Sequence, residues 1–306
     1  MKKTLIVRIG EGLGNQLFMY ANAYSLSKKF DSQLYIDDES SFFKEKNKTR
    51  SRSFNLNFFD LPENICLDKY KFNNYFKDFK RKLFKFSDKF TFKKRFLIEN
   101  LNHEKKTEYN EISFSKYSSL INIEGHFESE LYFKDFEKDL KKILIIKKDL
   151  IDHNNSYIDK IKNTNSISIH LRKNRFTEHD KNLDIVNINK DIEFEKNLIE
   201  YVNKSINYFH QKVDKPHFFI WSNDPTKYKK LFSNPNIFTF IENNTTAMDF
   251  YLFSLCKNFI VSPSTFGYWG AFLSSHKQKI CLSPPSIKNN SGYYGFSNNQ
   301  DIKPEW

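Results

Sequence analysis

The N-terminal stretch TLIVRIGEGLGNQLF, residues 4–18, indicates the class of fold. It starts with a run rich in β-branched side chains, which predicts a strand, and continues with three of the chain's eight glycines within five residues. Residues 15–30 carry apolar side chains at helical spacing, and residues 33–36 predict a second strand that ends at Asp37. A strand, a glycine-rich turn, a helix and a second strand form a βαβ unit, which is typical of a doubly wound parallel sheet.

The second half of the chain continues this alternation. Strands are expected at 166–171, 217–221, 237–240, 259–261 and 280–282, with helices at 193–209, 246–256 and 265–273 and a short helix from Pro225. At 306 residues the chain has the length of about two domains. We therefore expect an α/β protein with two Rossmann-like domains, 1–155 and 156–306, that face each other across a cleft.

The composition limits the class of protein. Charged residues make up 28% of the chain and hydrophobic residues 39%, which indicates a folded globular protein. We find no run of about 20 uncharged apolar residues, as a membrane span needs, and the N-terminal apolar run is too short for a signal peptide. The three cysteines (Cys66, Cys256 and Cys281) are widely spaced and odd in number, which argues against a disulfide framework or a zinc site and favours a cytoplasmic protein.

The net charge of +12 favours anionic partners such as nucleic acid, a membrane surface or a phosphorylated substrate. Residues 69–95 hold 11 Lys and Arg, two acidic residues and nine aromatic residues. The apolar side chains from Phe72 to Phe90 recur every three or four residues, which predicts a basic aromatic helical insertion at about 66–105. We favour the interpretation that this stripe packs into the core. The alternative is a surface helix that touches an anionic membrane or acceptor.

The glycine turn is the first candidate binding site. Gly12 and Gly14 allow close approach of a ligand to the backbone, and the helix behind them supplies N–H groups for an anion. Asn15 and Gln16 add two amide side chains at the first turn of that helix. The turn lacks the complete G-x-G-x-x-G pattern of dinucleotide-binding proteins, although Asp37 lies at a suitable distance for a ribose contact. A nucleotide-cofactor (NAD(P)-type) oxidoreductase therefore stays an alternative, as does a basic nucleic-acid-binding protein.

Two further segments are suited to phosphate groups. The end of the strand at 166–171 releases a cluster of basic side chains: His170, Arg172, Lys173 and Arg175. Arginine binds phosphate through a bidentate fork and lysine acts as a point charge. Later in the chain, hydroxyl side chains at 262–265 precede a helix whose N-terminus can accept an anion.

Five segments, taken in order along the chain, resemble one enzyme family. They are GLGNQLF (12–18) followed by Tyr20-Ala21, GHFESE (125–130) followed by Tyr132-Phe133, FIWSND (219–224), Asp249 with Leu252, Ser254 and Leu255 before STFGYWG (264–270), and the final Pro304-Glu305-Trp306. In these segments the chain resembles the bacterial α-1,2-fucosyltransferases, glycosyltransferase family 11. The resemblance spans nearly the whole chain.

The resemblance implies a GT-B fold and an inverting transfer of L-fucose from the donor GDP-β-L-fucose to the 2-hydroxyl of a galactose-containing glycan. Arg172 and Lys173 would stabilise charge on the departing β-phosphate. The implied donor-binding residues are Gly12, Gly14, Asn15, Gln16, His170, Arg175, Ser222, Asp224, Asp249, Ser264, Thr265 and Phe266. No cofactor and no metal are expected, because the sequence has no D-x-D motif or other carboxylate cluster suited to a divalent cation.

The central motif departs from the family pattern. Relatives carry His-x-Arg-Arg-Gly-Asp-Tyr, whereas residues 170–176 read HLRKNRF, so Lys173 replaces the second arginine and Arg175 replaces the aspartate. The general base is open, with Glu178, His179, Asp180 and Asp184 as candidates in the following segment. The resemblance also implies a role in lipopolysaccharide or O-antigen biosynthesis, with a lipid-linked acceptor and no nucleic acid partner. Peripheral contact with an anionic membrane is the expectation that the basic aromatic segment adds.

Overall fold

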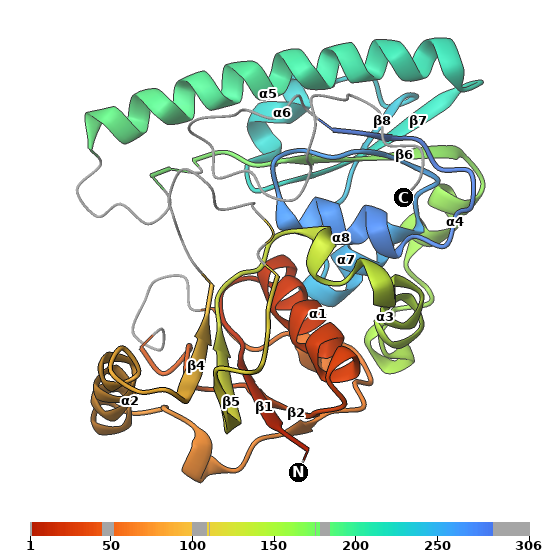
Figure 1. Cartoon of the computed structure of the whole chain (residues 1–306). Helices are drawn as coiled ribbons and strands as arrows, with labels where there is room; N and C mark the ends of the chain where they lie inside the picture. The colour runs from red at the N-terminus through yellow and green to blue at the C-terminus, as the bar shows by residue number, and fades with distance from the viewer. Residues whose placement is uncertain are drawn as a thin grey trace. The chain divides into compact units, whose positions relative to one another are not determined.

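The structure is a computed structural model that describes residues 2–44, 52–99, 109, 111–174, 176–177 and 184–283. It divides into two compact units, Met1–Lys147 and Lys148–Trp306, so the first unit ends somewhat before the domain boundary expected after residue 155. Each unit contains one five-stranded sheet whose paired strands run parallel (Figure 1). These two sheets confirm the predicted α/β class with two Rossmann-like domains.

The first unit has its sheet in the order β3-β2-β1-β5-β4. Its elements are β1 (Thr4–Arg8), α1 (Leu13–Lys29), β2 (Gln33–Asp37), β3 (Asn64–Ile65), α2 (Tyr75–Ser87), β4 (Lys94–Ile98), β5 (Tyr117–Glu124) and α3 (Glu137–Ile143), with short 3₁₀ helices at Leu56–Phe58, Asp68–Tyr70, Glu130–Tyr132 and Lys134–Phe136. Helix α1 packs against β1 and β2 and is buried along nearly its whole length. The glycine turn thus joins the central strand to the most buried helix of this unit.

The second unit has its sheet in the order β10-β9-β6-β7-β8. Its elements are α4 (Ser156–Lys162), β6 (Asn165–Leu171), α5 (Ile185–Lys212), β7 (Pro216–Ser222), α6 (Pro225–Leu231), β8 (Phe238–Phe240), α7 (Thr246–Leu255), β9 (Asn258–Ile260), α8 (Thr265–Leu273) and β10 (Cys281–Leu282), with a 3₁₀ helix at Lys148–Leu150. The strands and helices predicted for this half are confirmed. Helix α5 begins at Ile185, before the expected start at residue 193. The apolar face that predicted the helix is confined to its later turns.

Side-chain alternation along β6 separates the two faces of this sheet. Ile167, Ile169 and Leu171 join the apolar core formed with α5 and α6. The residues between them turn to the other face, where His170 lies against Phe266 of α8 with ring centroids 5.5 Å apart. Strand β6 therefore presents polar side chains to the face that α8 covers.

The basic aromatic segment differs from the favoured prediction. Among its described residues, Tyr75–Ser87 form an α-helix and Asp68–Tyr70 a 3₁₀ helix, and the chain then enters β4, a strand that was not expected from the sequence. The expected core packing of the stripe is wrong: Phe76, Phe79 and Phe86 are 70%, 58% and 59% exposed. The physical reason is that the polar face of α2 finds ionic partners in the first unit.

In the parts of the chain that the structure describes, no helix has both the length and the apolar character needed to cross a bilayer.

Candidate functional site

In the sheet of the second unit, β7 and β8 lie on one side of β6, and β9 and β10 lie on the other. Loops diverge at the carboxyl ends of β6 and β9, and doubly wound sheets bind ligands at such a switch point. The segments that follow these strands, 172–174 and 261–264, form the candidate site of this unit. Both segments are ones that the sequence predicts to bind phosphate groups.

Lys173 is held against the end of β7. Its Nζ lies 2.8 Å from Asp224 Oδ2, its backbone N–H donates to Asn223 Oδ1 at 2.8 Å, and its carbonyl accepts from Asn223 Nδ2 at 3.0 Å. The Asp224 partner raises the pKa of Lys173, and Lys173 lowers the pKa of Asp224. Ser222 Oγ accepts from the Asp224 N–H at 3.0 Å, so this hydroxyl shapes the same turn. Lys173 therefore carries its charge in a fixed place beside Arg172.

His170 presents a neutral ring to this edge. Burial, with a further contribution from the positive charge of Arg172, lowers the pKa of His170 to about 4. Its Nδ1 is buried and has no hydrogen-bond partner among the residues that the structure describes. A neutral imidazole beside Phe266 can donate or accept one hydrogen bond without adding to the cationic charge.

Helix α8 starts at the switch point. Its N-cap residue Ser264 makes no side-chain capping hydrogen bond, and Thr265 and Phe266 occupy its first turn. The N-terminus of a nine-residue helix offers backbone N–H groups and a positive dipole end to an anion. Burial raises the pKa of Asp249, which lies on α7. Hydrogen bonding with the side chains of Asn244 and Trp221 acts in the opposite direction and lowers that pKa. This carboxyl group therefore lies close to the end of β7, which carries Trp221.

Four of the predicted residues, Arg175, Glu178, His179 and Asp180, lie outside the described residues. The closing Pro304-Glu305-Trp306 motif lies outside them too.

The glycine turn of the first unit was expected to offer the Gln16 amide to a ligand, but this amide is bonded to the protein backbone. Gln16 donates from Nε2 to the carbonyls of Glu11 and Ser53, both at 2.8 Å, and accepts the Asn55 N–H at 2.8 Å. These contacts use both amide protons, so Gln16 ties the start of α1 to residues 53–55. The left-handed residue of the turn is Glu11, with φ of 64°, whereas a Cβ added at Gly12 would meet nothing within 4 Å. Gly14 is buried in α1 and Asn15 is partly exposed.

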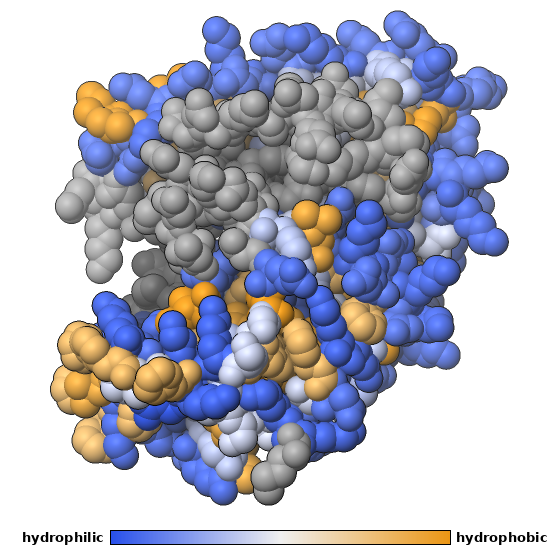
Figure 2. Space-filling view, viewed as in Figure 1, coloured by the Kyte–Doolittle hydropathy of each residue, from blue (hydrophilic) through white to orange (hydrophobic). Residues whose placement is uncertain are grey.

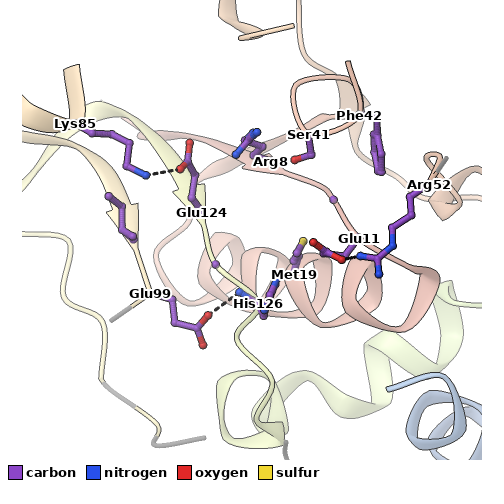
Figure 3. A pocket seen from close by; sticks show the side chains of 13 residues that line it. Arg8, Glu11, Met19, Ser41, Phe42, Arg52, Lys85, Glu99, Glu124 and His126 are labelled. Atoms are coloured by element: carbon purple, nitrogen blue, oxygen red, sulfur yellow. Dashed lines mark hydrogen bonds and ion pairs between the residues drawn. The ribbon is translucent and has the colours of Figure 1, made fainter. Parts of the chain in front are cut away.

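A cavity of about 320 Å³ opens at the carboxyl ends of β1, β4 and β5 (Figure 3). That volume falls within the range of about 300–1,000 Å³ usual for small-molecule sites. Strand β1 lies between β2 and β5, so this is the switch point of the first sheet. The cavity is lined by Arg8, Gly10, Glu11, Met19, Ser41, Phe42, Arg52, Lys85, Ile98, Glu99, Glu124, Gly125 and His126.

The cavity combines cationic and anionic side chains with one histidine. Glu99 Oε2 accepts the His126 N–H at 2.6 Å, and Arg52 forms an ion pair with Glu11. Figure 3 shows that pair and the Lys85–Glu124 pair at opposite ends of the cavity. Burial lowers the pKa of Arg8, whose Nη2 donates to the Ser40 carbonyl at 2.9 Å. Such a lining provides donors and acceptors for a polyhydroxylated ligand.

Sequence reasoning did not identify Arg8, Glu99 or Glu124 as lining a site. Arg8 and Glu124 lie at the ends of β1 and β5, and Glu99 directly follows β4. These strands are distant in sequence, and two of them, β4 and β5, lie in the stretch where the secondary-structure signal is weak. The available signal was the GHFESE segment, which follows β5 directly.

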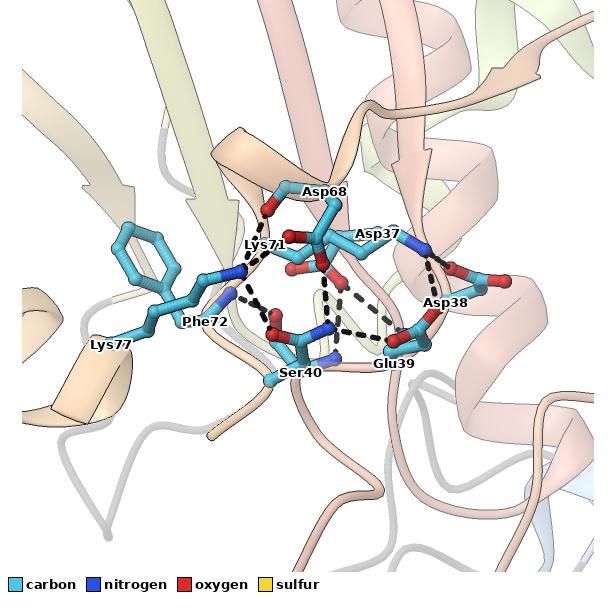
Figure 4. Close-up of polar contacts among 9 residues, drawn as sticks. Asp37, Asp38, Glu39, Ser40, Asp68, Lys71, Phe72 and Lys77 are labelled. Atoms are coloured by element: carbon cyan, nitrogen blue, oxygen red, sulfur yellow. Dashed lines mark hydrogen bonds and ion pairs between the residues drawn. The ribbon is translucent and has the colours of Figure 1, made fainter. Parts of the chain in front are cut away.

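Asp37, which the alternative oxidoreductase would use for ribose, is engaged in a turn. It is 2% exposed, and its Oδ1 accepts the N–H groups of Glu39 at 3.2 Å and Ser40 at 3.0 Å. Figure 4 shows how this turn is tied to the segment before α2: Lys71 Nζ lies 2.6 Å from Asp38 Oδ1 and 2.7 Å from Glu39 Oε1. The carboxylate therefore stabilises local structure.

Among the described residues, no three or more His, Cys, Asp or Glu side chains gather in a group that could hold a metal ion.

Known glycosyltransferases are similar to this chain over nearly its whole length. Residues 4–306 match the model of a protein family that is described as Glycosyl transferase family 11. The chain is 28% identical over 284 residues to an alpha-1,2-colitosyltransferase of Escherichia coli, covering 92% of this chain and 91% of that protein. It is also 28% identical over 300 residues to the O-antigen biosynthesis glycosyltransferase WbnK of Escherichia coli, covering 89% and 91%.

Solved fucosyltransferases share the fold. NodZ alpha-1,6-fucosyltransferase, solved after soaking with GDP-fucose, has a TM-score of 0.51 at 13% identity and covers 95% of this chain and 97% of its own. A variant of Arabidopsis thaliana FUT1 in complex with GDP has a TM-score of 0.53 at 12% identity and covers 94% and 72%. This likeness confirms the expected GT-B fold. With a family match over nearly its whole length, the chain belongs to glycosyl transferase family 11 and is a glycosyltransferase.

Proposed function

We propose that the protein transfers L-fucose from GDP-β-L-fucose to the 2-hydroxyl of a galactoside, with inversion and without a metal or cofactor. The observation that carries the proposal is the switch point of the second unit. There Arg172 and Lys173 follow β6, and the N-terminus of α8 follows β9. Two cations and a helix N-terminus at one sheet edge suit a pyrophosphate. The likeness to enzymes solved with GDP-fucose and GDP supports the choice of nucleotide.

In this proposal the second unit binds the donor and stabilises the leaving group. As the glycosidic bond breaks, negative charge grows on the β-phosphate, and Arg172 and Lys173 meet it without needing to reorganise. The contacts of Lys173 with Asn223 and Asp224 fix its position before the donor binds. The side chains of Ser264 and Thr265 seat the pyrophosphate, and Asp249 accepts a ribose hydroxyl.

The first unit binds the acceptor in its cavity. Carboxylates and guanidinium groups recognise sugar hydroxyls through paired donors and acceptors, and the cavity supplies both kinds of group. The candidates for the base that takes the acceptor proton are Glu178, Asp180 and His126, of which His126 lines the cavity. Glu178→Gln, Asp180→Asn and His126→Gln separate these candidates, because replacing the base alone removes the acid limb of the kcat/KM profile against pH.

The donor sugar has one competing candidate. The similar colitosyltransferase transfers colitose, which is L-fucose without its 3-hydroxyl. A site built to hydrogen-bond a hydroxyl rejects an analogue that lacks it, so relative rates with the two donors reveal which sugar the site fits.

We further propose that the protein works at the cytoplasmic side of a membrane on a lipid-linked glycan. The support is the 28% identity to an O-antigen biosynthesis glycosyltransferase.

An assay that measures release of the nucleoside diphosphate, GDP or UDP, tests the proposal. GDP-fucose, GDP-colitose and UDP-galactose are each offered with a soluble β-galactoside and with its 2-deoxy analogue as the matched control. Release of GDP from GDP-fucose with the galactoside, and none above background with the 2-deoxy sugar, is expected. Faster release from GDP-colitose would replace fucose by colitose as the donor sugar. Equal rates with both acceptors, or transfer from UDP-galactose, would refute the proposed function.

A further inference from the structure

Helix α2 is attached to the first unit by its polar face. Asp78, 3% exposed, pairs with Lys44 at 2.5 Å and with Arg81 at 2.8 Å. Arg81 Nη1 also donates to both carboxylate oxygens of Glu124, at 2.8 and 3.0 Å, and Lys85 reaches Glu124 at 2.8 Å. Burial acts to raise the pKa of both carboxyls, but these cations more than offset it and hold both pKa values below the ordinary range. Ion pairs thus occupy the side of α2 that an ordinary surface helix fills with apolar residues.

The apolar face of α2 points away from the unit. Its large side chains are at least half exposed, and the exposed aromatic residues continue into the following turn. They are Tyr75 at 76%, Phe76 at 70%, Phe79 at 58%, Leu83 at 50%, Phe86 at 59%, Phe90 at 76% and Phe92 at 99%. Figure 2 shows a group of orange, hydrophobic atoms at the lower left, where Figure 1 places α2. Contiguous apolar patches are rare on isolated soluble proteins and mark surfaces that bind something.

Exposed lysines surround this apolar patch. Lys80 lies on the same side of the helix as Phe76, with Nζ 5.5 Å from the ring centroid, and Lys89 lies 5.8 Å from the centroid of Phe86. The Lys82 side chain is 65% exposed and lies 3.9 Å from Asp78. A hydrophobic stripe with lysines along its border matches a bilayer that presents acyl chains beneath anionic headgroups.

We propose that residues 75–92 form a docking surface for an anionic phospholipid bilayer, with the phenylalanines inserted and the lysines at headgroup level. Charge decides among the possible occupants. A second copy packed on this patch would bring two lysine borders together, and like charges disfavour that contact. A nucleic acid duplex would satisfy the lysines through its phosphates but would leave the exposed phenylalanines in water, because its bases are stacked within the helix. This inference rests on α2 and is independent of the donor, acceptor and linkage proposed above.

Vesicle sedimentation with the full chain tests the proposal. Vesicles of phosphatidylcholine with about one third phosphatidylglycerol should bind the protein at low salt, and pure phosphatidylcholine vesicles should bind it at least tenfold more weakly. Binding should weaken as salt shortens the screening length to about 8 Å. Equal binding to both vesicle types, or none to the anionic vesicles, would overturn the proposal.

Two surface variants locate the contact. Phe79→Ser/Phe86→Ser should lower the partition coefficient by roughly a hundredfold, and Lys80→Glu/Lys82→Glu/Lys89→Glu should abolish binding. The matched controls lie on α5 and α6: Ile192→Ser/Leu231→Ser, at residues 62% and 55% exposed, and Lys190→Glu/Lys196→Glu/Lys212→Glu. The controls should bind vesicles like the unchanged protein. Loss of binding in the controls as well, or a wild-type dimer in solution that Phe79→Ser/Phe86→Ser dissociates, would refute the membrane assignment.

Discussion

Replacing Glu124 by glutamine should loosen α2 from the first unit. The carboxylate is 8% exposed and accepts three charge-assisted hydrogen bonds, two from Arg81 and one from Lys85. Leaving a buried charge without its partner costs about 3–5 kcal/mol. Arg81 keeps Asp78 at 2.8 Å, and the Lys85 side chain is 29% exposed, so we expect about 2–3 kcal/mol. In a unit of this size that loss lowers the melting temperature by roughly 4–10 °C.

Thermal unfolding followed by circular dichroism measures this loss. Glu137→Gln is the matched control, because Glu137 pairs with Lys141 at 2.6 Å on the partly exposed surface of α3. Such a pair contributes about 0.3–0.5 kcal/mol. If the two variants melt within about 1 °C of each other, the ion pairs do not hold α2 and the reasoning fails. Replacing Arg81 and Glu124 together by leucine should recover part of the stability, because Arg81 is then no longer a buried charge without Glu124. Asp78 keeps its pair with Lys44, and the Lys85 side chain is 29% exposed and can reach water.

Three further predictions concern the second unit. Arg172→Ala should lower kcat by about 10²–10³-fold and Arg172→Lys should recover only part, while Lys227→Ala, which removes a surface lysine paired with Glu195, should leave kcat unchanged in the transfer assay. Lys173→Arg should keep or raise turnover and Lys173→Ala should lower it strongly; equal rates for both would mean that its charge does not reach the phosphate. The third prediction is that the free energy of unfolding falls as the pH is lowered. Because folding lowers the pKa of His170 from 6.5 to about 4, the unfolded chain takes up a proton first as pH falls, so stability decreases by about 3 kcal/mol between these values. His170→Gln should flatten that part of the urea-unfolding profile, and an unchanged profile would contradict the buried neutral ring.

The sequence was most informative where short apolar strands alternate with helices. In β6 and β7, buried residues occupy consecutive positions, and such runs are read directly as parallel strands. Strand β4 was missed because its sequence, KRFLI, begins with two cations, and its partner β5 was missed because polar residues interrupt it. Both strands form the wall of the cavity, so the cavity was missed with them.

Helix α2 shows the limit of periodicity. A 3.6-residue pattern establishes that one face is apolar, but it does not state which way that face points. The direction here depends on Glu124, which lies on β5 and is distant in sequence from Arg81 and Lys85. Likewise, Gln16 was correctly placed at the start of α1, yet its amide is engaged by backbone groups at Ser53 and Asn55 that no local pattern reveals.

The proposed transfer of fucose can be followed in one NMR experiment. The protein is incubated with GDP-β-L-fucose, a soluble β-galactoside and EDTA, and the product is observed before secondary reactions accumulate. The account predicts an α-fucosyl anomeric proton with a long-range correlation to galactose C2, formed at an undiminished rate in the chelator. A β-fucosyl product, a correlation to another galactose carbon, or product that appears only after Mg²⁺ is added would contradict it.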